Sequence, residues 1–569
     1  RTRRLKSKKN WEKFRDLLIE MKILETCPKG TVDEMTNYII AKIQEAYDKA
    51  IPLVAVKPRA QCYLHRETKA YIKRQTRLRS RLRSLTPDTQ RHIEVKSLLK
   101  IIDTCVDDKL KNDRINHHIR LLEISKDKRK NLFAHVKEAK STPSVNITGP
   151  VIDADGVLRT SDREVAEAFS GLMGDQLKSD EKSEINWEIP HPDRPRKTRN
   201  HMISCIFVKR EAIIAQIKKS RLQAAPGPDG VSMEAFSVAK DILAGPLTAL
   251  FNLINQTGIV PEHFKEARVK MLYKKNEKSD MLNYRPLAMA NHLAKLWERI
   301  VNSELMEHLE KNGLLSKFQY GFRPRRGTAE NLIQLWEHVV DRVEKEKTHI
   351  ELWSLDLTKA FDKLNHVKVL DLLHKSGVYG PMGLSIQNWL TERNQFVEVG
   401  SSRSTRTKVN RSCIQGSVLG PTLWLIYINT LLVELDEAKV KFFAYADDVA
   451  IVQRLDTEQD KEEFEEVLEI LQKWAEKYEM AWSPLKTQRL VFKYPSGPKH
   501  HDPLEMYFGG KKIEPLEKSC TSLGIQIGAN CTFSEHIKKV KNQIKILTGL
   551  VKKNFANLTQ ALLDRYYMV

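Results

Sequence analysis

Two adjacent acidic residues stand between two apolar runs in the segment Lys441-Phe-Phe-Ala-Tyr-Ala-Asp-Asp-Val-Ala-Ile-Val-Gln453. Apolar, β-prone runs on both sides predict a hairpin that carries Asp447 and Asp448 at its tip. Two like charges in an apolar hairpin are costly unless a cation neutralises them, which favours a metal site. An exposed turn that only tolerates aspartate is the alternative, and the pair alone does not decide between the two.

A third carboxylate ends a second apolar strand. The segment His349-Ile-Glu-Leu-Trp-Ser-Leu-Asp356 delivers Asp356 just before the chain turns toward a helix. If this strand pairs beside the hairpin, Asp356 meets Asp447 at one place. The carboxylates of Asp356, Asp447 and Asp448 would then be ligands for two Mg²⁺ ions, which also bind substrate phosphates. Two such ions stabilise the attacking and the leaving oxygen of an in-line phosphoryl transfer, and we expect that chemistry here.

The elements around these residues predict an α+β or α/β core, because helices and short strands alternate from about residue 203 onward. The first third of the chain reads as helical and strongly basic. No acidic residue occurs between Lys69 and Leu85, which favours a phosphate-binding surface over a solvated helix face or a nuclear-localisation cluster. The basic residues of this stretch are Lys69, Lys73, Arg74, Arg77, Arg79, Arg81 and Arg83.

Clustered Pro, Ser and Gly residues predict two linkers or surface loops, Lys140–Pro150 and Asn186–Arg196. Between them, Ser161 and Glu164 have the spacing of a capping box at the start of a short helix that reaches Gly171.

The amino-acid composition limits which binding partners and which redox compartment are expected. The 569-residue chain has 95 Lys and Arg against 73 acidic residues, a net charge of +22 that attracts polyanions, most commonly nucleic acid. Its seven scattered cysteines include no Cys-x-x-Cys pair, which argues against a disulfide framework or zinc ribbon and fits a reducing compartment. The apolar tract Val418–Val433 contains Pro421 and Asn429 and is better explained as a buried helix than as a membrane span. The chain begins without Met, and we expect it to be a piece of a longer protein.

The blocks around the carboxylates resemble those of reverse transcriptases from non-LTR (LINE-type) retrotransposons, closest to the Jockey-like group. Tyr445-Ala-Asp-Asp448 is similar to their central box, and the similarity runs in order from about Arg221 to Ile527. Each block alone is a weak to moderate signal, but chance does not explain the ordered set. The other blocks are Arg221-Leu-Gln-Ala-Ala-Pro-Gly-Pro-Asp-Gly230, Asn283-Tyr-Arg-Pro-Leu287, Lys295-Leu-Trp-Glu298, Gln319-Tyr-Gly-Phe-Arg323, Gly327-Thr328, Ile414-Gln-Gly-Ser-Val-Leu-Gly-Pro421 and Ser522-Leu-Gly-Ile525.

The resemblance implies roles for individual residues. Lys486 would be catalytic beside the three aspartates, because it is similar to the lysine thought to protonate pyrophosphate. Phe361 lies where the family places the residue beneath the incoming sugar, and a bulky ring there would collide with a 2′-hydroxyl and favour deoxynucleotides. Its alternative reading is a core aromatic without a selective role. Asp362 is interpreted as a structural acid that could cap the following helix.

Binding roles follow from the same resemblance. Nucleotide contacts are expected from Arg285, whose guanidinium suits bidentate phosphate binding, and from Lys274, Gln415 and Gly416. Nucleic-acid contacts are expected from Lys73, Arg74, Arg77, Arg81, Arg323, Leu523 and Gly524, the last two in the primer-grip hairpin. Two positions depart from the family: Ser483 stands where Asn is usual, and Ile414 stands where Pro usually precedes the Gln-Gly pair. Neither departure touches a predicted metal ligand.

The resemblance also implies the fold, a right-hand polymerase of class α+β with a largely helical, basic N-terminal extension. The expected divisions are 1–140 for an RNA-binding extension, 141–202 for a connecting region, 203–345 for the fingers, 346–512 for the palm with the catalytic carboxylates, and 513–569 for the primer grip and the start of the thumb.

The mechanism implied is target-primed reverse transcription. A nicked target DNA would supply the 3′-hydroxyl primer, the element's own RNA the template, and dNTPs the substrates. An endonuclease domain is expected on the same polyprotein, no membrane partner is expected, and the site of action is expected to be the nucleus after synthesis in the cytoplasm as a ribonucleoprotein.

Two alternatives stay open. The chain could be a catalytically silent nucleic-acid-binding protein that retains the fold, or an intron-encoded reverse transcriptase or maturase. The intact acidic trio together with Phe361, Arg285 and Gln415 argues against the silent scaffold, because a binding protein has no need of that set.

Overall fold

The structure is a computed structural model that describes residues 2–4, 6–55, 64–87, 89–124, 150–177, 185–188, 202–347, 349–413, 415–492 and 503–555. The chain divides into two compact units, a larger one of Leu5–Pro52 and Asn146–His536 and a smaller one of Arg1–Arg4, Leu53–Val145 and Ile537–Val569. Most of the predicted linkers at 140–150 and 186–196 lies outside the described residues.

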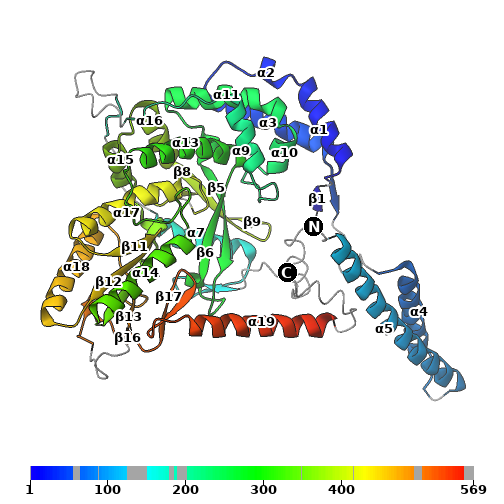
Figure 1. Ribbon diagram of the computed structural model, residues 1–569. Helices are drawn as coiled ribbons and strands as arrows, with labels where there is room; N and C mark the ends of the chain where they lie inside the picture. The colour runs from blue at the N-terminus through cyan, green and yellow to red at the C-terminus, as the bar shows by residue number, and fades with distance from the viewer. Residues whose placement is uncertain are drawn as a thin grey trace. The chain divides into compact units, whose positions relative to one another are not determined.

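The larger unit is built on a central sheet of five strands in the order β11-β12-β7-β13-β16 (Figure 1). All neighbours are antiparallel except β13 and β16, which are parallel. The strands are β7 (Ile350–Leu355), β11 (Phe442–Tyr445), β12 (Asp448–Arg454), β13 (Gln488–Phe492) and β16 (Pro515–Leu516). The β7 strand therefore pairs beside the β11–β12 hairpin, as the sequence predicted.

Both faces of the central sheet are covered by helices, which is why its strands are apolar at consecutive positions. On one face, Trp353 and Ile451 belong to the same buried cluster as α17 (Gly420–Glu437) and α18 (Glu458–Lys477). On the other face, Leu352 and Val452 pack with α14 (Thr328–Glu346). The tract Val418–Val433 thus contributes a buried helix, as predicted, and no helix among the described residues is long and apolar enough to cross a membrane.

A second sheet has the order β10-β8-β5-β6, with β9 paired to β8. Its strands are β5 (Glu266–Tyr273), β6 (Tyr284–Ala290), β8 (Arg393–Val399), β9 (Ser402–Arg403) and β10 (Thr407–Val409). Helix α7 (Asp162–Gln176) covers one face and begins with the predicted capping box of Ser161 and Glu164, but continues past the expected end at Gly171.

This second sheet crosses the predicted domain boundary. Strands β8 to β10 fall in the range 346–512 that was assigned to the palm, yet β8 pairs in parallel with β5 from the range 203–345. Parallel pairing of strands that are more than a hundred residues apart leaves no local mark in the sequence, so the boundary could not be read from it.

The first described helices also belong to the larger unit rather than to a separate extension of residues 1–140. Helix α3 (Val32–Ala50) buries Ile39 and Ile43 in the main core. The remaining elements of this unit are α1 (Lys8–Glu20), α2 (Ile23–Thr26), β3 (Val151–Ile152), β4 (Leu158–Arg159), α9 (Arg210–Lys219), α10 (Met233–Val238), α11 (Lys240–Thr257), α12 (Glu262–Lys265), η2 (Met281–Asn283), α13 (His292–Lys311), η3 (Ala360–Lys363), α15 (His366–Lys375), α16 (Gly380–Leu390), β14 (Tyr507–Phe508), β15 (Lys511–Lys512), β17 (Ser519–Ser522) and β18 (Ile525–Gly528).

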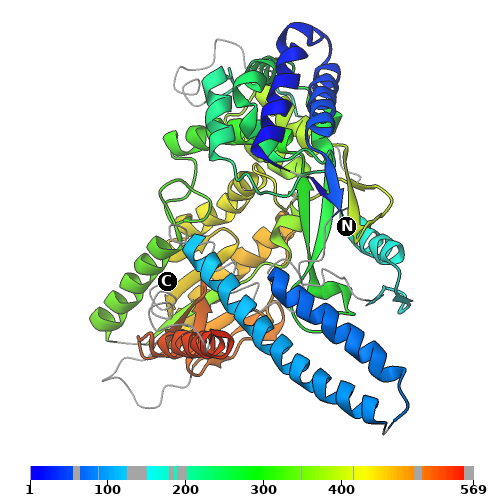
Figure 2. The same cartoon turned by 90° about the vertical axis from the view of Figure 1, so that its right-hand side faces the viewer.

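The smaller unit contains a pair of packed helices, α4 (Arg66–Arg83) and α5 (Gln90–Ile124), joined by a short turn (Figure 2). It also holds the short strands β1 (Thr2–Arg4) and β2 (Leu53–Ala55) and the residues of α19 (Ser534–Phe555) from Ile537 onward. The described chain is thus a mixture of helices and sheets that agrees with the α+β class.

Candidate active site

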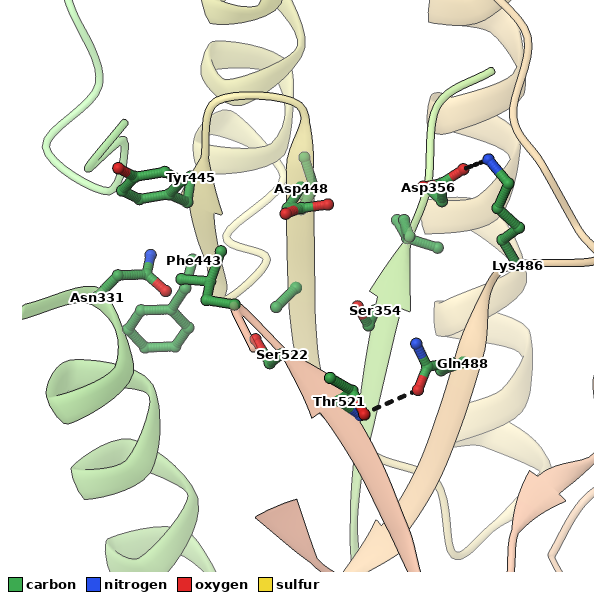
Figure 3. A pocket seen from close by; sticks show the side chains of 14 residues that line it. Asn331, Ser354, Asp356, Phe443, Tyr445, Asp448, Lys486, Gln488, Thr521 and Ser522 are labelled. Carbon is green, nitrogen blue, oxygen red and sulfur yellow. Dashed lines mark hydrogen bonds and ion pairs between the residues drawn. The ribbon is translucent and has the colours of Figure 1, made fainter. Parts of the chain in front are cut away.

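The pairing of β7 with β12 brings two of the predicted carboxylates to one place. Leu355 is the register partner of Val449. Asp356 follows Leu355 and Asp448 precedes Val449 on the antiparallel neighbour, so the two aspartates stand at the same end of the sheet. Figure 3 shows both side chains at the mouth of one cleft. Asp447 occupies the turn between β11 and β12 and does not line this cleft. The sequence had placed Asp447 beside Asp356, and repulsion from Asp356 does act on the Asp447 carboxylate.

The walls of the cleft come from segments far apart in the chain. Ser354 and Gln488 lie on neighbouring strands of the central sheet, and Thr521 and Leu523 come from the β17–β18 hairpin. The Thr521 backbone N–H donates to Oε1 of Gln488 at 3.0 Å, which ties the hairpin to the sheet (Figure 3). The turn of that hairpin is Leu523-Gly524, and both residues have positive φ, +47° and +86°.

The site concentrates negative charge in a partly desolvated place. Burial raises the pKa of Asp447, repulsion from Asp356 adds to this shift, and the charges of Arg285 and Lys486 oppose it. Burial, followed by repulsion from Asp447 and Asp356, raises the pKa of Asp448 to about 6. The three carboxylates are therefore close enough to repel one another, which is the electrostatic signature of a cation-binding group.

Lys486 is in direct contact with this group. Its Nζ lies 2.7 Å from Oδ2 of Asp356. The turn that carries Lys486 is fixed to the same aspartate, because the Ser483 backbone N–H donates to the Asp356 carbonyl at 2.8 Å and Lys486 N–H to the Ser483 carbonyl at 3.0 Å. Ser483 makes this contact through its backbone, so a serine in place of the family's asparagine leaves it intact.

The donor chemistry of the site fits a divalent cation, since carboxylate oxygens are the ligands that hard ions such as Mg²⁺ prefer. Within the part of the chain that the structure describes, however, no three Asp, Glu, His or Cys side chains already stand in a metal-binding arrangement. One oxygen of Asp356 is engaged by Lys486 instead. The three aspartates thus have the ligand type and the proximity that a metal site needs. Their side chains are not already arranged around one point.

The second sheet reaches the site through β6 and the loop before α17. Arg285 is exposed on β6, and its charge acts on both Asp447 and Asp362. The Ala288 backbone N–H donates to the Gln415 carbonyl at 3.0 Å. Gly416 has φ +107°, and a Cβ at this position would lie 2.7 Å from the Ala288 carbonyl oxygen, so the close approach of loop and strand requires glycine.

Asp362 does not cap the next helix, contrary to our expectation. That role belongs to Asn365, whose side chain accepts from the Lys368 backbone N–H at 3.2 Å. Asp362 instead accepts a hydrogen bond from Nε2 of Gln415 at 2.9 Å, and burial raises its pKa. The acid therefore holds the side chain of a predicted nucleotide-binding residue in place.

Phe361 sits in η3 between the two acids at 356 and 362 and is only partly buried. One neighbour is the fully buried Trp424, at a ring-centroid distance of 5.5 Å, and another is the exposed Phe322, edge-to-face at 6.2 Å. The ring is thus supported from the core and keeps some exposed surface.

Two predicted binding residues, Arg323 and Lys274, stand elsewhere. Arg323 is buried, and its guanidinium binds the Glu310 carboxylate through two nitrogens at 2.7 Å each and the Ser316 carbonyl, so it ties α13 to the following loop rather than facing a nucleic acid. Lys274 is exposed just after β5 and does not line the cleft. Ile414 lies outside the described residues.

Glu298 shapes the site, although no individual role was predicted for it. It is completely buried on α13, and its Oε2 accepts from the backbone N–H groups of Val418 at 2.6 Å and Leu419 at 3.4 Å. These amides begin the helix that follows the Gln415-Gly416 loop. The available signal was a glutamate inside the apolar block Lys295-Leu-Trp-Glu298, since a buried charge needs partners.

Comparison with known proteins bears on the same residues. Residues 273–527 match the family model described as reverse transcriptase (RNA-dependent DNA polymerase). The chain is 27% identical over 338 residues to the RNA-directed DNA polymerase from mobile element jockey of Drosophila melanogaster. The aligned region covers 58% of this chain and 36% of that protein. It is 25% identical over 427 residues to the jockey polymerase of Drosophila funebris, covering 74% of this chain and 45% of the relative.

A more distant similarity is to the Pol polyprotein of the R2 retrotransposable element of Popillia japonica, 28% identical over 257 residues, or 43% of this chain and 35% of the relative. The chain spans less than half the length of each of these three relatives.

The raised pKa of Asp448 predicts a pH-dependent gain in stability on removing its charge. Since the folded chain holds this proton up to about pH 6 while the ordinary pKa is 3.8, the ionised carboxylate destabilises the fold increasingly between pH 4 and 6 and by a constant amount above. Asp448→Asn should therefore raise Tm by about 1–2 °C at pH 8 and leave it nearly unchanged at pH 4. Thermal unfolding in EDTA measures this, with the exposed carboxylate Asp16→Asn as control. Equal effects at both pH values would contradict the prediction.

Proposed function

We propose that residues 273–527 form a reverse transcriptase domain of the Jockey-like non-LTR type, and that the chain copies an element RNA into DNA from a DNA 3′-hydroxyl. The observation that carries the proposal is the register of β7 and β12, which gathers Asp356 and Asp448 within the matched range. In a right-hand polymerase the central sheet is the palm, the second sheet belongs to the fingers, and the β17–β18 hairpin is the primer grip.

The proposed chemistry assigns a task to each predicted catalytic and nucleotide-binding residue. Asp356, Asp447 and Asp448 would hold two Mg²⁺ ions, which when bound supply positive charge to the attacking and leaving oxygens. Arg285 is exposed on β6 and orients the triphosphate by charge-assisted hydrogen bonds. Lys486 holds its Nζ 2.7 Å from Oδ2 of Asp356 at the edge of the site, where it would meet a leaving pyrophosphate. Gln415, held by Asp362, positions the incoming nucleotide.

The template, primer and cellular site of the reaction are proposed from the names of the relatives, which are proteins of mobile elements. Target-primed synthesis would use a nicked target DNA as primer and the element RNA as template, with an endonuclease on the same polyprotein. Such a reaction takes place on chromosomes, so the protein would act in the nucleus after assembling with its RNA in the cytoplasm. The net charge of +22 supports binding to polyanions of this kind.

Primer extension on a defined RNA template tests the activity. With Mg²⁺ and dNTPs the chain should extend a DNA primer, and Asp447→Ala should reduce the rate at least about a thousandfold, because loss of several kcal/mol of transition-state stabilisation is expected when a metal ligand is removed. Asp371→Asn, which changes a half-exposed acid on α15, is the control that should keep full activity. Tight RNA binding without extension by the unmodified chain would favour the silent scaffold instead.

Sugar selection is tested at Phe361. Phe361→Val should raise the efficiency of rNTP incorporation relative to dNTP at least about tenfold, a change of about 1.4 kcal/mol, because a smaller side chain leaves room for a 2′-hydroxyl. Single-nucleotide kinetics with each substrate measure the ratio. Phe533→Val, which removes a partly exposed ring packed against Trp336, is the matched control. An unchanged ratio would mean that Phe361 only packs against Trp424.

The basic helix α4 is proposed as an RNA-binding surface, because some of its basic residues pair with α5 while others are exposed on a different face. Arg79 is engaged by Asp103 of α5 at 3.2 Å, and Lys109 of α5 by Glu67 of α4 at 3.0 Å, so one face of α4 is used for helix pairing. Lys73, Arg77 and Arg81 recur every four residues on another face and are exposed. Successive residues at this spacing are about 6 Å apart, a distance suited to neighbouring phosphates of one strand.

Replacing Lys73, Arg77 and Arg81 by Gln should therefore weaken RNA binding and lower the slope of log K against log salt by about 2, since each phosphate contact to a single strand contributes about 0.7. Titration of a fluorescent RNA at several salt concentrations measures both. The same charge is removed by replacing Arg91, Lys96 and Lys100, exposed on α5, and this control should change the slope much less. Equal losses in the two variants would show a general charge effect rather than a binding face.

A further inference from the structure

The turn that carries Asp447 is built on an unusual backbone conformation. Ala446, the residue before Asp447, has φ +58°. Non-glycine residues rarely adopt this left-handed region, and alanine gains nothing there from a side-chain hydrogen bond. Such a conformation persists only where the surroundings impose it, at a cost of about 1–3 kcal/mol. Some neighbouring group must therefore hold the turn.

Gln319 is that neighbour. Its side-chain oxygen Oε1 accepts a hydrogen bond from the Ala446 backbone N–H at 2.9 Å, and its Nε2 donates to the Ala446 carbonyl at 3.2 Å. The same Oε1 accepts a second hydrogen bond, from the Gly321 backbone N–H at 2.8 Å. The residue is 1% exposed, so none of these contacts competes with water. One planar amide thus satisfies both backbone groups of the strained residue.

The segment that supplies Gln319 is itself fixed along the outer edge of β11. Tyr320 N–H donates to the Ala444 carbonyl at 2.8 Å, and Ala444 N–H donates to the Phe318 carbonyl at 2.9 Å. Gly321 lies so close to the turn that a Cβ there would stand 2.3 Å from the Ala446 nitrogen. The amide of Gln319 therefore approaches from a rigid support, with no space for the turn to relax toward it.

We propose that Gln319 is a positioning residue for Asp447: its side-chain amide fixes the backbone of Ala446 and thereby sets the direction in which the next carboxylate points. The inference rests on the proposed function for its effect on catalysis, but the geometric part concerns the turn alone. Only an amide of this length meets the need, because it offers one donor and one acceptor in a fixed plane. Methionine has the same length and neither group.

The test compares two buried glutamines that undergo the same substitution. Gln319→Met removes the clamp, whereas Gln395→Met changes a residue that is 5% exposed on β8 and makes no contact with the turn. In single-nucleotide extension, Gln319→Met should lower kcat 10- to 100-fold with KM for dNTP and RNA affinity within about twofold of the unmodified chain. Gln395→Met should leave kcat within about twofold.

A second substitution separates positioning from general loss of stability. Ala446→Gly lowers the cost of a positive φ, so the double variant Gln319→Met/Ala446→Gly should recover at least threefold in kcat over Gln319→Met. A residue that only stabilised the fold would give no such recovery. Unchanged kcat in Gln319→Met, or equal losses in Gln319→Met and Gln395→Met, would overturn the proposal.

Hydrogen exchange gives a readout that does not need activity. Peptides covering residues 442–449 should exchange at least tenfold faster in Gln319→Met and at the unmodified rate in Gln395→Met, because the Ala446 amide loses its acceptor. If the unmodified chain proves inactive, the proposed function fails while this measurement still decides whether Gln319 holds the turn. Unchanged exchange in Gln319→Met would refute the positioning role.

Discussion

The pairing of β7 with β12 is the constraint on which the rest of the site depends. It joins strands almost a hundred residues apart in the chain and makes Leu355 the partner of Val449, so that Asp356 and Asp448 are neighbours at one end of the sheet. A shift of the register by one residue would move every side chain of β12 to the opposite face. The helices α14, α17 and α18 prevent such a shift, because each face of the sheet buries a different set of apolar residues against them.

Bringing three carboxylates together costs free energy. Nearby cationic side chains offset part of this repulsion, and a buried ion pair in the sheet holds the strands in place. Burial and mutual repulsion raise the pKa values of Asp447 and Asp448, while Lys486 contacts Asp356 and Arg285 faces the group from the second sheet. Below the site, the fully buried pair of Arg489 and Glu351 joins β13 to β7 through two hydrogen bonds of 2.6 and 2.7 Å. Such a pair holds a specific strand arrangement, since removal of either partner leaves a buried charge alone.

Several buried polar side chains hold loops that make no strand pairing with the central sheet. Glu298 binds the amides that follow the Gln415-Gly416 loop, and Asp362 binds the Gln415 side chain. The backbone of the same loop is joined to β6 at Ala288. The predicted nucleotide-binding loop of Gln415 and Gly416 is thus joined to the second sheet and to Asp362 by one set of hydrogen bonds. The proposed polymerase activity would require such rigidity, because misplacement of reacting groups by about 1 Å is enough to slow a reaction markedly.

The sequence by itself determined the chemistry and the local elements. Apolar, β-prone runs on both sides of Asp447 and Asp448 indicated the hairpin, the apolar strand before Asp356 indicated its neighbour, and the Ser161–Glu164 spacing indicated the start of α7. Only the tertiary structure decided that Asp448 lines the cleft with Asp356, that Asn365 and not Asp362 caps α15, and that Arg323 is buried against Glu310. It also placed β8 to β10 on the second sheet and residues 5–52 in the larger unit. The physical reason is the same in each case: residue type and spacing record propensity and charge, whereas burial, register and hydrogen-bond partners depend on segments distant in the chain.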